Sequence, residues 1–169
     1  MRKISSFVCF LIVLSAVQTC RRQEYPLFRQ ADSQWANEKI GDLTLGYCGC
    51  LITSIAMILN QRGMTYNGQA YTPKTCLQFL KANGGLSGNL VAFSAYSKWG
   101  ISMEQKFNVP DIKAAFDAGH DVIIFIDGWH WVVVKSYNTT GFQVNDGGYQ
   151  KQSDIAFGRV NSAIVLRRF

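Results

Sequence analysis

Residues 49–63 read Gly-Cys-Leu-Ile-Thr-Ser-Ile-Ala-Met-Ile-Leu-Asn-Gln-Arg-Gly. Nearly every position from Cys50 to Leu59 is apolar, and Gly63 supplies a helix stop. The stretch therefore predicts a helix over 50–62 that has hardly any polar face. Because a helix that is apolar on most sides lies in the middle of its domain, we expect the rest of the fold to surround it.

Helices are predicted in the first half of the remaining chain and strands in the second. Helical patterns, each closed by Gly, extend over 72–83, 89–98 and 108–118. Runs rich in Val, Ile and aromatic residues predict strands over 121–126, 129–137, 142–146 and 163–166. Segregated helices and strands indicate an α+β fold, with the central helix packed on an antiparallel sheet.

The N-terminus has the three-part layout of an export signal. A short basic start precedes an unbroken apolar run over 7–14, which is shorter than the roughly 20 apolar residues of a membrane span. We expect residues 1–19 to direct export and residues 20–29 to tether a single domain over 30–169. The end of the signal loosely resembles a bacterial lipobox. Two outcomes stay open: a lipid anchor at Cys20, or cleavage and release as a secreted or periplasmic protein.

The composition is that of a globular domain. Of the 169 residues, 48% are apolar and 17% are charged, a balance that is typical of folded chains. The net charge of +6 comes from scattered Lys and Arg, whereas nucleic-acid proteins usually carry a basic stripe. The Cys and His spacings do not match a structural zinc site. We therefore expect a monomer that binds no nucleic acid, metal or cofactor.

Three cysteines follow the export signal, namely Cys48, Cys50 and Cys76. In an oxidising compartment, one disulfide and one free thiol account for an odd number of cysteines. We predict a bridge between Cys48 and Cys76, because that pairing leaves Cys50 free.

Cys50 has the position of a nucleophile. It follows Gly49 and opens the apolar helix, where the helix dipole and unpaired backbone N–H groups favour a thiolate. The alternative is a small buried hydrophobe, which is the commoner role of a lone cysteine. The position at the start of the helix favours the nucleophile.

A thiolate needs a base, and the chain offers His120 and His130. His120 stands in a predicted helix-to-strand turn, where an exposed histidine is the ordinary interpretation. His130 lies on a predicted strand between Trp129 and Trp131, and such neighbours restrict the rotamer of the imidazole and keep it partly dry. We predict His130 as the general base, with a purely structural histidine as the alternative.

Asp146 is the candidate for the residue that orients His130. In a tight hairpin around a turn at 138–141, residues 130 and 146 face each other, and directly opposed residues have Cβ atoms about 4.5–5.5 Å apart. Asp146 would then fix the tautomer of the imidazole. The alternative is that Asp146, Gly147 and Gly148 form only a turn.

The chemistry also needs donors for an oxyanion. The backbone N–H of Cys50 at the helix N-terminus is one donor, and a side-chain amide is the usual second. Gln30 and Gln34 both precede the nucleophile, and these residues alone do not separate them.

Four motifs in this order resemble the bacteriocin-processing (double-glycine leader) peptidases and their stand-alone relatives. That family has a papain-like fold, and the resemblance covers residues 30–166. The motifs are Gln30-x-Asp-x-x-Trp, Gly49-Cys50-Leu-Ile-Thr-Ser-Ile-Ala-Met57, the strand pair at 118–123 and 129–134, and Val144-Asn145-Asp146.

The resemblance implies a papain-like cysteine peptidase that acts on a peptide or protein substrate. It assigns Cys50 as nucleophile, His130 as base and Asp146 as the orienting residue. For the oxyanion donor it favours Gln30 over Gln34.

Two departures from the family pattern stand beside this assignment. Gly147 follows the aspartate where members often have Pro, and Cys48 is not part of the pattern. Two other functions also stay open, because a fold does not choose its function. One is an amidase, deamidase or acyl transferase that uses the same triad on cell-wall or protein amides. The other is a non-catalytic binding module on a peptidase scaffold.

Overall fold

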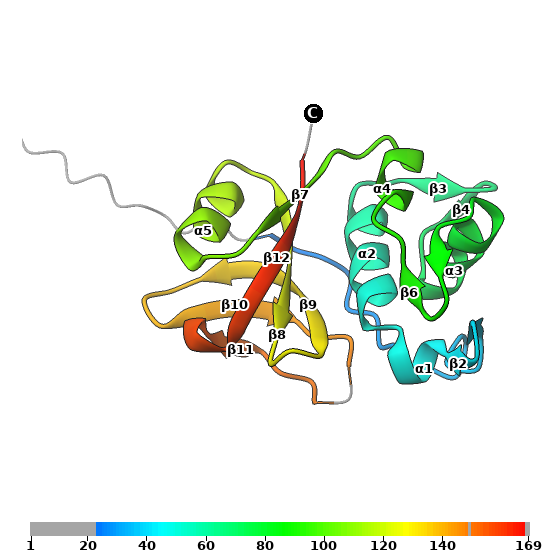
Figure 1. Ribbon diagram of the computed structural model, residues 1–169, viewed down its shortest axis with the longest axis horizontal. Helices are drawn as coiled ribbons and strands as arrows, with labels where there is room; N and C mark the ends of the chain where they lie inside the picture. Colours follow the sequence, from blue (N-terminus) through cyan, green and yellow to red (C-terminus); the bar gives the residue numbers. More distant parts are fainter. Residues whose placement is uncertain (1–22, 149, 168–169) are drawn as a thin grey trace, which may run out of the picture.

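The computed structural model describes residues 23–148 and 150–167. Figure 1 shows a helical half and a sheet half, with α2 between them. The helices are α1 (Leu45–Cys48), α2 (Cys50–Gln61), α3 (Pro73–Ala82), α4 (Ala95–Lys98), α5 (Val109–Asp117) and a short 3₁₀ turn, η1 (Phe157–Arg159).

The sheet half consists of six antiparallel strands in the order β11-β10-β9-β8-β12-β7. They are β7 (Met103–Lys106), β8 (Asp121–Ile126), β9 (His130–Tyr137), β10 (Gly141–Asn145), β11 (Asp154–Ala156) and β12 (Val160–Leu166). Three small hairpins lie in the helical half: β1 (Lys39–Ile40) with β2 (Leu43–Thr44), β3 (Thr65–Tyr66) with β4 (Gln69–Ala70), and β5 (Leu86–Ser87) with β6 (Leu90–Val91). The α+β prediction is confirmed, although β7 and β11 were not anticipated.

The apolar helix is the central element, as its sequence predicts. Residues 51–59 of α2 are all buried, and the helix ends with Arg62 as its C-cap. It packs against α3 on one side and against β8 and β9 on the other. The helix therefore contacts both halves of the molecule.

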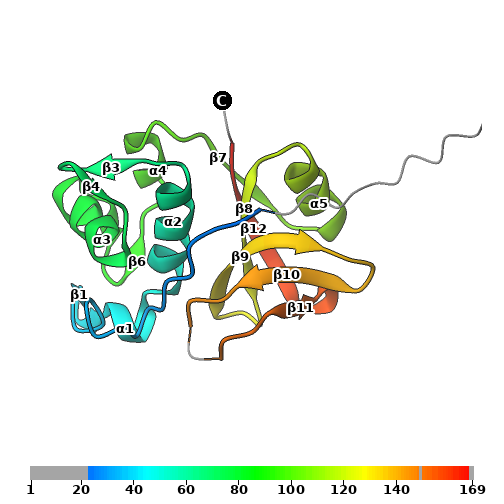
Figure 2. The same ribbon diagram turned by 180° about the vertical axis from the view of Figure 1, so that it is seen from behind.

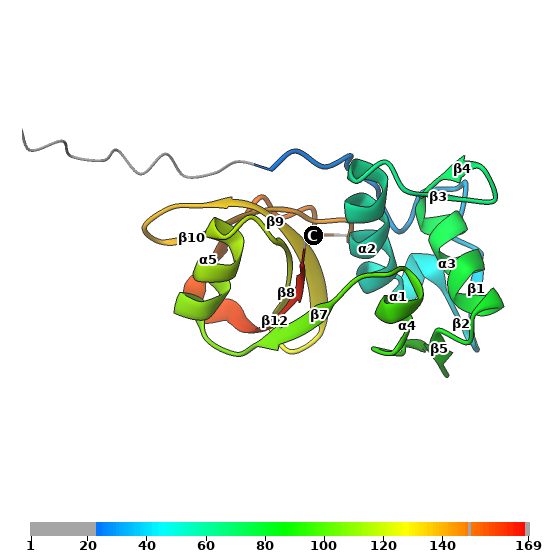
Figure 3. The same ribbon diagram turned by 90° about the horizontal axis from the view of Figure 1, so that it is seen from above.

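Two apolar clusters fill the two faces of the sheet. Ile123 and Val133 join the cluster around α2 and α3. Val122 and Ile124 join the cluster under α5, around which the sheet curls (Figure 3). Neighbouring residues of β8 thus belong to opposite clusters, as the two-residue period of a strand requires.

The predicted helix starts at Thr72 and Asn108 are confirmed. The Thr72 side chain accepts from the backbone N–H of Thr75 at 3.2 Å, and the Thr75 hydroxyl bonds back to the Thr72 N–H at 2.7 Å. The Asn108 side chain accepts from the backbone N–H of Asp111 at 2.9 Å. Each side chain satisfies a donor that the first helical turn leaves without a partner.

The helix predicted over 89–98 is mostly wrong, because only Ala95–Lys98 is helical. Gly88 has a φ of 58° and lets β5 turn directly into β6. The Asn89 side chain caps no helix; its Oδ1 accepts the backbone N–H of Asp42 at 3.0 Å. Gly88 and Asn89 thus form a hairpin turn, where we expected Asn89 to begin a helix.

Residues 23–29, which we expected to be part of a tether, are joined to the sheet at Gln23 and Tyr25. The Gln23 N–H donates to Lys135 O at 2.8 Å, and the Tyr25 hydroxyl donates to Asp121 at 2.7 Å. Figure 2 shows this segment running from the sheet half to the helical half. The predicted export signal and anchor site lie outside the described residues. No helix within 23–148 or 150–167 is long and apolar enough to cross a bilayer.

The predicted bridge between Cys48 and Cys76 is wrong, because both are free thiols. Cys76 is fully buried in the core beside α2, and this burial raises the pKa of its thiol. Cys48 is half-buried at the end of α1, where its sulfur contacts Thr44 O at 3.5 Å. The two side chains therefore lie in different surroundings. Cys76 fills the core, and Cys48 borders a cavity.

Candidate active site

Cys50 is the first residue of α2 and is half-buried. The preceding Gly49 is the N-cap, and no side chain caps this helix. A Cβ atom at position 49 would lie 2.3 Å from the carbonyl oxygen of Leu45, so only glycine lets α1 and α2 meet so closely. The thiol is thereby held at the open N-terminus of a buried helix, where the dipole favours a negative charge.

A cavity of about 630 Å³ lies beside this helix N-terminus, between the helical half and the sheet half. It brings together three residues that the sequence singled out, namely Gln30, Cys50 and His130. The rest of its lining is Leu43, Tyr47, Cys48, Leu51, Ile52, Asn89, Leu90, Val91, Phe125, Trp129, Trp131 and Gly148.

His130 is the first residue of β9 and is buried. The turn before it places Asp127 at φ 54° and Gly128 at φ 78°, the left-handed geometry of a tight hairpin. The Gly128 N–H donates to Asn161 Oδ1 at 2.8 Å, which fixes the turn. The indole of Trp129 stacks on the imidazole with ring centroids 5.0 Å apart, so the base is held from one side.

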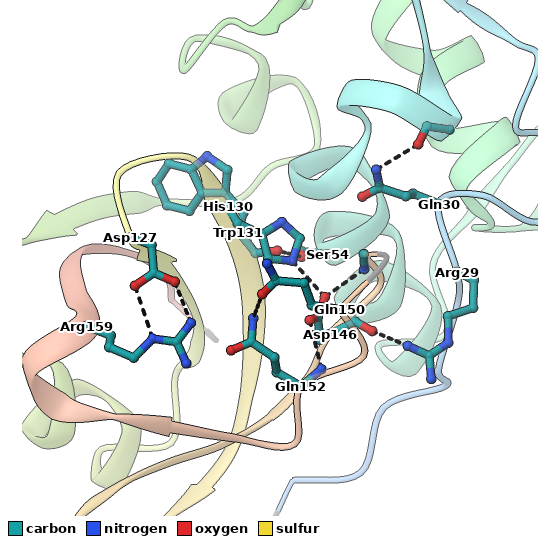
Figure 4. A network of polar contacts seen from close by, with 12 residues as sticks. Arg29, Gln30, Ser54, Asp127, His130, Trp131, Asp146, Gln150, Gln152 and Arg159 are labelled. Carbon is teal, nitrogen blue, oxygen red and sulfur yellow. Dashed lines mark hydrogen bonds and ion pairs between the residues drawn. The ribbon is translucent and has the colours of Figure 1, made fainter.

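Asp146 contacts His130 directly. Its Oδ1 lies 2.7 Å from Nε2 of the imidazole, as drawn in Figure 4. Cys50 and His130 line the same cavity, and their interaction is one of the causes that raise the pKa of the imidazole. The contact predicted between residues 130 and 146 is therefore present, and it holds an imidazole that borders the same cavity as the sulfur.

The register behind this contact differs from the simple hairpin that we expected. Gln143 pairs with Ser136, but Val144 pairs with Val134, so β9 contains one extra residue in a bulge. Direct opposition of Asp146 and His130 is therefore wrong. Because side chains alternate along a strand, the extra residue keeps Asp146 on the same side of the sheet as His130.

The carboxylate of Asp146 is fully engaged by donors. The backbone N–H of Gly148 donates to Oδ1 at 2.7 Å, and that of Gln152 donates to Oδ2 at 3.0 Å. Arg29 donates to the backbone oxygen of Asp146 at 2.6 Å, from the segment that we expected to be a tether. Figure 4 shows these contacts converging on the loop after β10.

These contacts favour the charged form of both side chains, because they raise the pKa of His130 and lower that of Asp146. Burial opposes a charge on His130, but the hydrogen bonds with Asp146 and Cys50 outweigh it and raise the pKa of His130 to about 9. Burial also opposes ionisation of Asp146, but bonds from His130, Gln152 and Gly148 hold its pKa below the usual value. At neutral pH the pair is an imidazolium beside a carboxylate.

Gly147 and Gly148 leave no room for side chains. A Cβ atom at 148 would lie 2.5 Å from Cε1 of His130, and one at 147 would lie 2.6 Å from Cγ2 of Thr53. The Asp-Gly-Gly stretch is therefore more than a turn, because the glycines let the aspartate approach both the imidazole and α2.

The two candidate oxyanion side chains lie in different places. Gln30 is buried and lines the cavity, whereas Gln34 is exposed and lies outside it. The Nε2 of Gln30 donates to Gly46 O at 2.9 Å and to Tyr47 O at 3.3 Å. The backbone N–H of Gln30 donates to Gly147 O at 2.8 Å, so this residue is joined to the loop of Asp146.

Sequence reasoning missed Arg29, although a basic residue next to Gln30 was a visible signal. Trp129 was expected to restrict the rotamer of His130, and its indole does stack on the imidazole. His120 lies between α5 and β8 and does not line the cavity. Within residues 23–148 and 150–167, no group of three His, Cys, Asp or Glu is placed to hold a metal ion.

No family model and no curated protein matches the sequence. Solved structures do resemble the chain. A double glycine motif protease from an AMS/PCAT transporter, solved with a leader peptide, matches with a TM-score of 0.57 and 16% identity, over 88% of this chain and 95% of that chain. A putative C39-like peptidase from Bacillus anthracis matches with 0.53 and 14%, over 87% and 99%.

The peptidase domain of Streptococcus ComA, a bi-functional ABC transporter in a quorum sensing pathway, has a TM-score of 0.50 and 15% identity, covering 77% of this chain and 97% of its own. These likenesses establish the fold. The chain has the α+β, papain-like fold of the double-glycine peptidase domains, as the sequence motifs predicted.

Proposed function

We propose that this chain is a cysteine peptidase with Cys50 as nucleophile, His130 as acid and base, and Asp146 as the residue that orients the imidazole. The observation that carries the proposal is that Asp146 contacts His130 at 2.7 Å, while His130 and Cys50 line one cavity and Cys50 helps to raise the pKa of the imidazole. Nucleophilic catalysis needs such an arrangement, in which the base touches the nucleophile and a third group holds the base.

The reaction proceeds in two halves. The Cys50 thiolate attacks the carbonyl carbon of the scissile amide, and His130 donates its proton to the leaving amine as the C–N bond breaks. The acyl group stays on sulfur as a thioester. His130 then takes a proton from a water molecule, whose oxygen attacks the thioester and releases the acid. Asp146 does not exchange protons; it stabilises the imidazolium.

The oxyanion of each tetrahedral intermediate needs donors in a dry site. The backbone N–H of Cys50 is one, because α2 has no capping side chain. Gln30 is the second, because it is buried and lines the cavity. Its Nε2 now donates to Gly46 O at 2.9 Å and to Tyr47 O at 3.3 Å, and the longer of these bonds is the one that the oxyanion replaces.

We also propose that the protein acts after export, released or anchored at Cys20, which mass spectrometry of its mature N-terminus tests.

Labelling with iodoacetamide tests the nucleophile. In the folded, reduced protein, Cys50 is expected to react at neutral pH far faster than Cys48, while the buried Cys76 stays unmodified.

Cys50→Ala is expected to abolish cleavage of casein with unchanged circular dichroism. An active Cys50→Ala protein contradicts the nucleophile, and cleavage of peptidoglycan fragments but not casein favours the amidase. Failure to label Cys50 in the folded, reduced protein favours the binding module.

A further inference from the structure

The cavity at Cys50 has mostly apolar walls, and the only lining residues that can carry a full charge at neutral pH belong to the site. Its lining contains no Asp, Glu, Lys or Arg. The polar side-chain groups there are those of the site residues, with Cys48, Asn89, the Tyr47 hydroxyl and the indole N–H groups of Trp129 and Trp131. A charged side chain bound in this cavity would lose water and gain no partner of opposite charge, which is costly.

Exposed apolar residues gather at the rim of the same cavity. Six large apolar side chains are exposed among the described residues, and three of them line it: Tyr47 at 72%, Leu90 at 71% and Trp129 at 56%. Large exposed apolar groups that converge on a hollow mark a binding site. The other three, Leu27, Phe93 and Phe107, lie outside the cavity.

The two walls of the cavity are built from different halves of the molecule. On the sheet side, Phe125 and Trp131 are cross-strand partners with ring centroids 4.6 Å apart. On the helical side, Leu90 stands on β6, whose turn is tied to another loop by Asn89. Both walls are therefore preformed, and the space between them is wide enough for a large side chain.

Resting on the proposed function, we infer that this peptidase selects a bulky, uncharged apolar side chain, such as Leu, Met or Phe, next to the scissile amide. Cys50 and the apolar rim border the same cavity, so the side chain beside the attacked carbonyl is the one that the walls enclose. Substrates with a carboxylate or an ammonium group at this position, as in the stem peptides of bacterial cell walls, are disfavoured.

The test uses peptide aldehydes and fluorogenic peptides that differ only in the side chain of the residue that carries the reactive carbonyl. An aldehyde adds to the Cys50 thiol: a C–S bond forms, the carbonyl oxygen takes the proton, and nothing leaves. Protection of Cys50 from iodoacetamide therefore measures binding without turnover. We expect the Leu aldehyde to protect at a concentration roughly tenfold lower than the Ala aldehyde, and far lower than the Asp or Lys aldehyde.

Leu90→Ser and Phe107→Ser are matched variants, because each removes an exposed apolar side chain, inside and outside the cavity. Leu90→Ser is expected to lower the preference for Leu over Ala about tenfold in protection and in kcat/KM. Phe107→Ser leaves this ratio unchanged. Equal protection by the Leu, Ala and Asp aldehydes, or an unchanged ratio in Leu90→Ser, overturns the inference while Cys50 still labels and peptides are still cleaved. A Cys50 that never labels overturns the proposed function instead.

Discussion

Two buried aspartates stand near opposite ends of α2 and have different partners. Asp121 is fully buried and pairs with Arg62, the C-cap of the helix, at 2.8 Å. Asp146 is 2% exposed and contacts His130, which faces Cys50 at the N-terminus of the helix. Both carboxylates lie in dry surroundings, but only Asp146 contacts a residue that lines the cavity.

The partner decides what each aspartate can do. A guanidinium keeps its proton in proteins, so the pair of Asp121 and Arg62 is a permanent tie. Arg62 also donates to Leu166 O at 3.0 Å, which attaches the helix to β12. An imidazole can give and take a proton near neutral pH, so the pair of Asp146 and His130 suits chemistry. A buried carboxylate is therefore informative about function only together with its partner.

The largest expected effect is on activity when the imidazole is removed. His130→Ala should lower kcat/KM at least roughly a thousandfold, because neither the thiol nor the leaving amine keeps its proton-transfer partner. Steady-state cleavage of a fluorogenic peptide measures this. His120→Ala is the matched control and should stay near the wild-type rate, since that histidine lies outside the cavity. Comparable losses in both variants would contradict the assignment.

Breaking the pair at the other end of α2 should affect stability instead. Arg62→Met takes the charged partner from Asp121, and such a change costs roughly 3–5 kcal/mol. Thermal unfolding should show a midpoint lower by about 10 °C. The labelling rate of Cys50 in the folded protein should not change. A stable Arg62→Met protein would mean that the ion pair adds little to the fold.

Asp146→Asn should have an intermediate effect, with a loss of kcat/KM smaller than that of His130→Ala. Asparagine keeps a polar contact with the imidazole but loses the charge that stabilises its protonated form, so kcat/KM should fall about a hundredfold. The thermal midpoint should move much less than in Arg62→Met. Full activity in Asp146→Asn would show that the imidazole needs no orienting carboxylate, and the comparison of the two aspartates would lose its meaning.

The smallest effect concerns pH. Because the pKa of His130 is raised to about 9, its protonated form persists through neutral pH and is lost as the pH rises through about 9. Above that point kcat/KM should fall about tenfold per pH unit, since no proton remains for the leaving amine. The pair also stabilises the fold below the usual histidine pKa and loses this contribution over the same rise. In Asp146→Asn the fall in kcat/KM should begin at lower pH, and a flat profile up to pH 10.5 would contradict the role of His130.

The elements with strong local signals could be predicted from the sequence. The apolar run of α2, the caps at Thr72 and Asn108, and the Val-rich strands each fix their own structure. The stretch 89–98 could not be predicted, because Gly88 and Asn89 suit a hairpin turn as well as a helix start, and the choice depends on a bond to Asp42. The burial of Gln23 and Tyr25 likewise depends on distant partners.

The candidate site divides in the same way. Cys50, His130 and Gln30 were found from position and pattern, and the structure brings them to one cavity. The contact with Asp146 was predicted from direct opposition to His130, whereas Phe142 pairs with Tyr137 and β9 contains a bulge, so the outcome was right for a reason that was incomplete. Arg29 escaped notice, because its role is a bond to a backbone oxygen that no sequence pattern specifies.

The lack of space at Gly148 offers a filter for sorting related sequences. A methyl group there would meet the imidazole at 2.5 Å, so an alanine would displace the base although every titrating residue is still present in the sequence. A relative that keeps the cysteine, histidine and aspartate but carries a larger residue at this position should be counted among inactive homologues. Surveys that score only the reacting side chains would misclassify it.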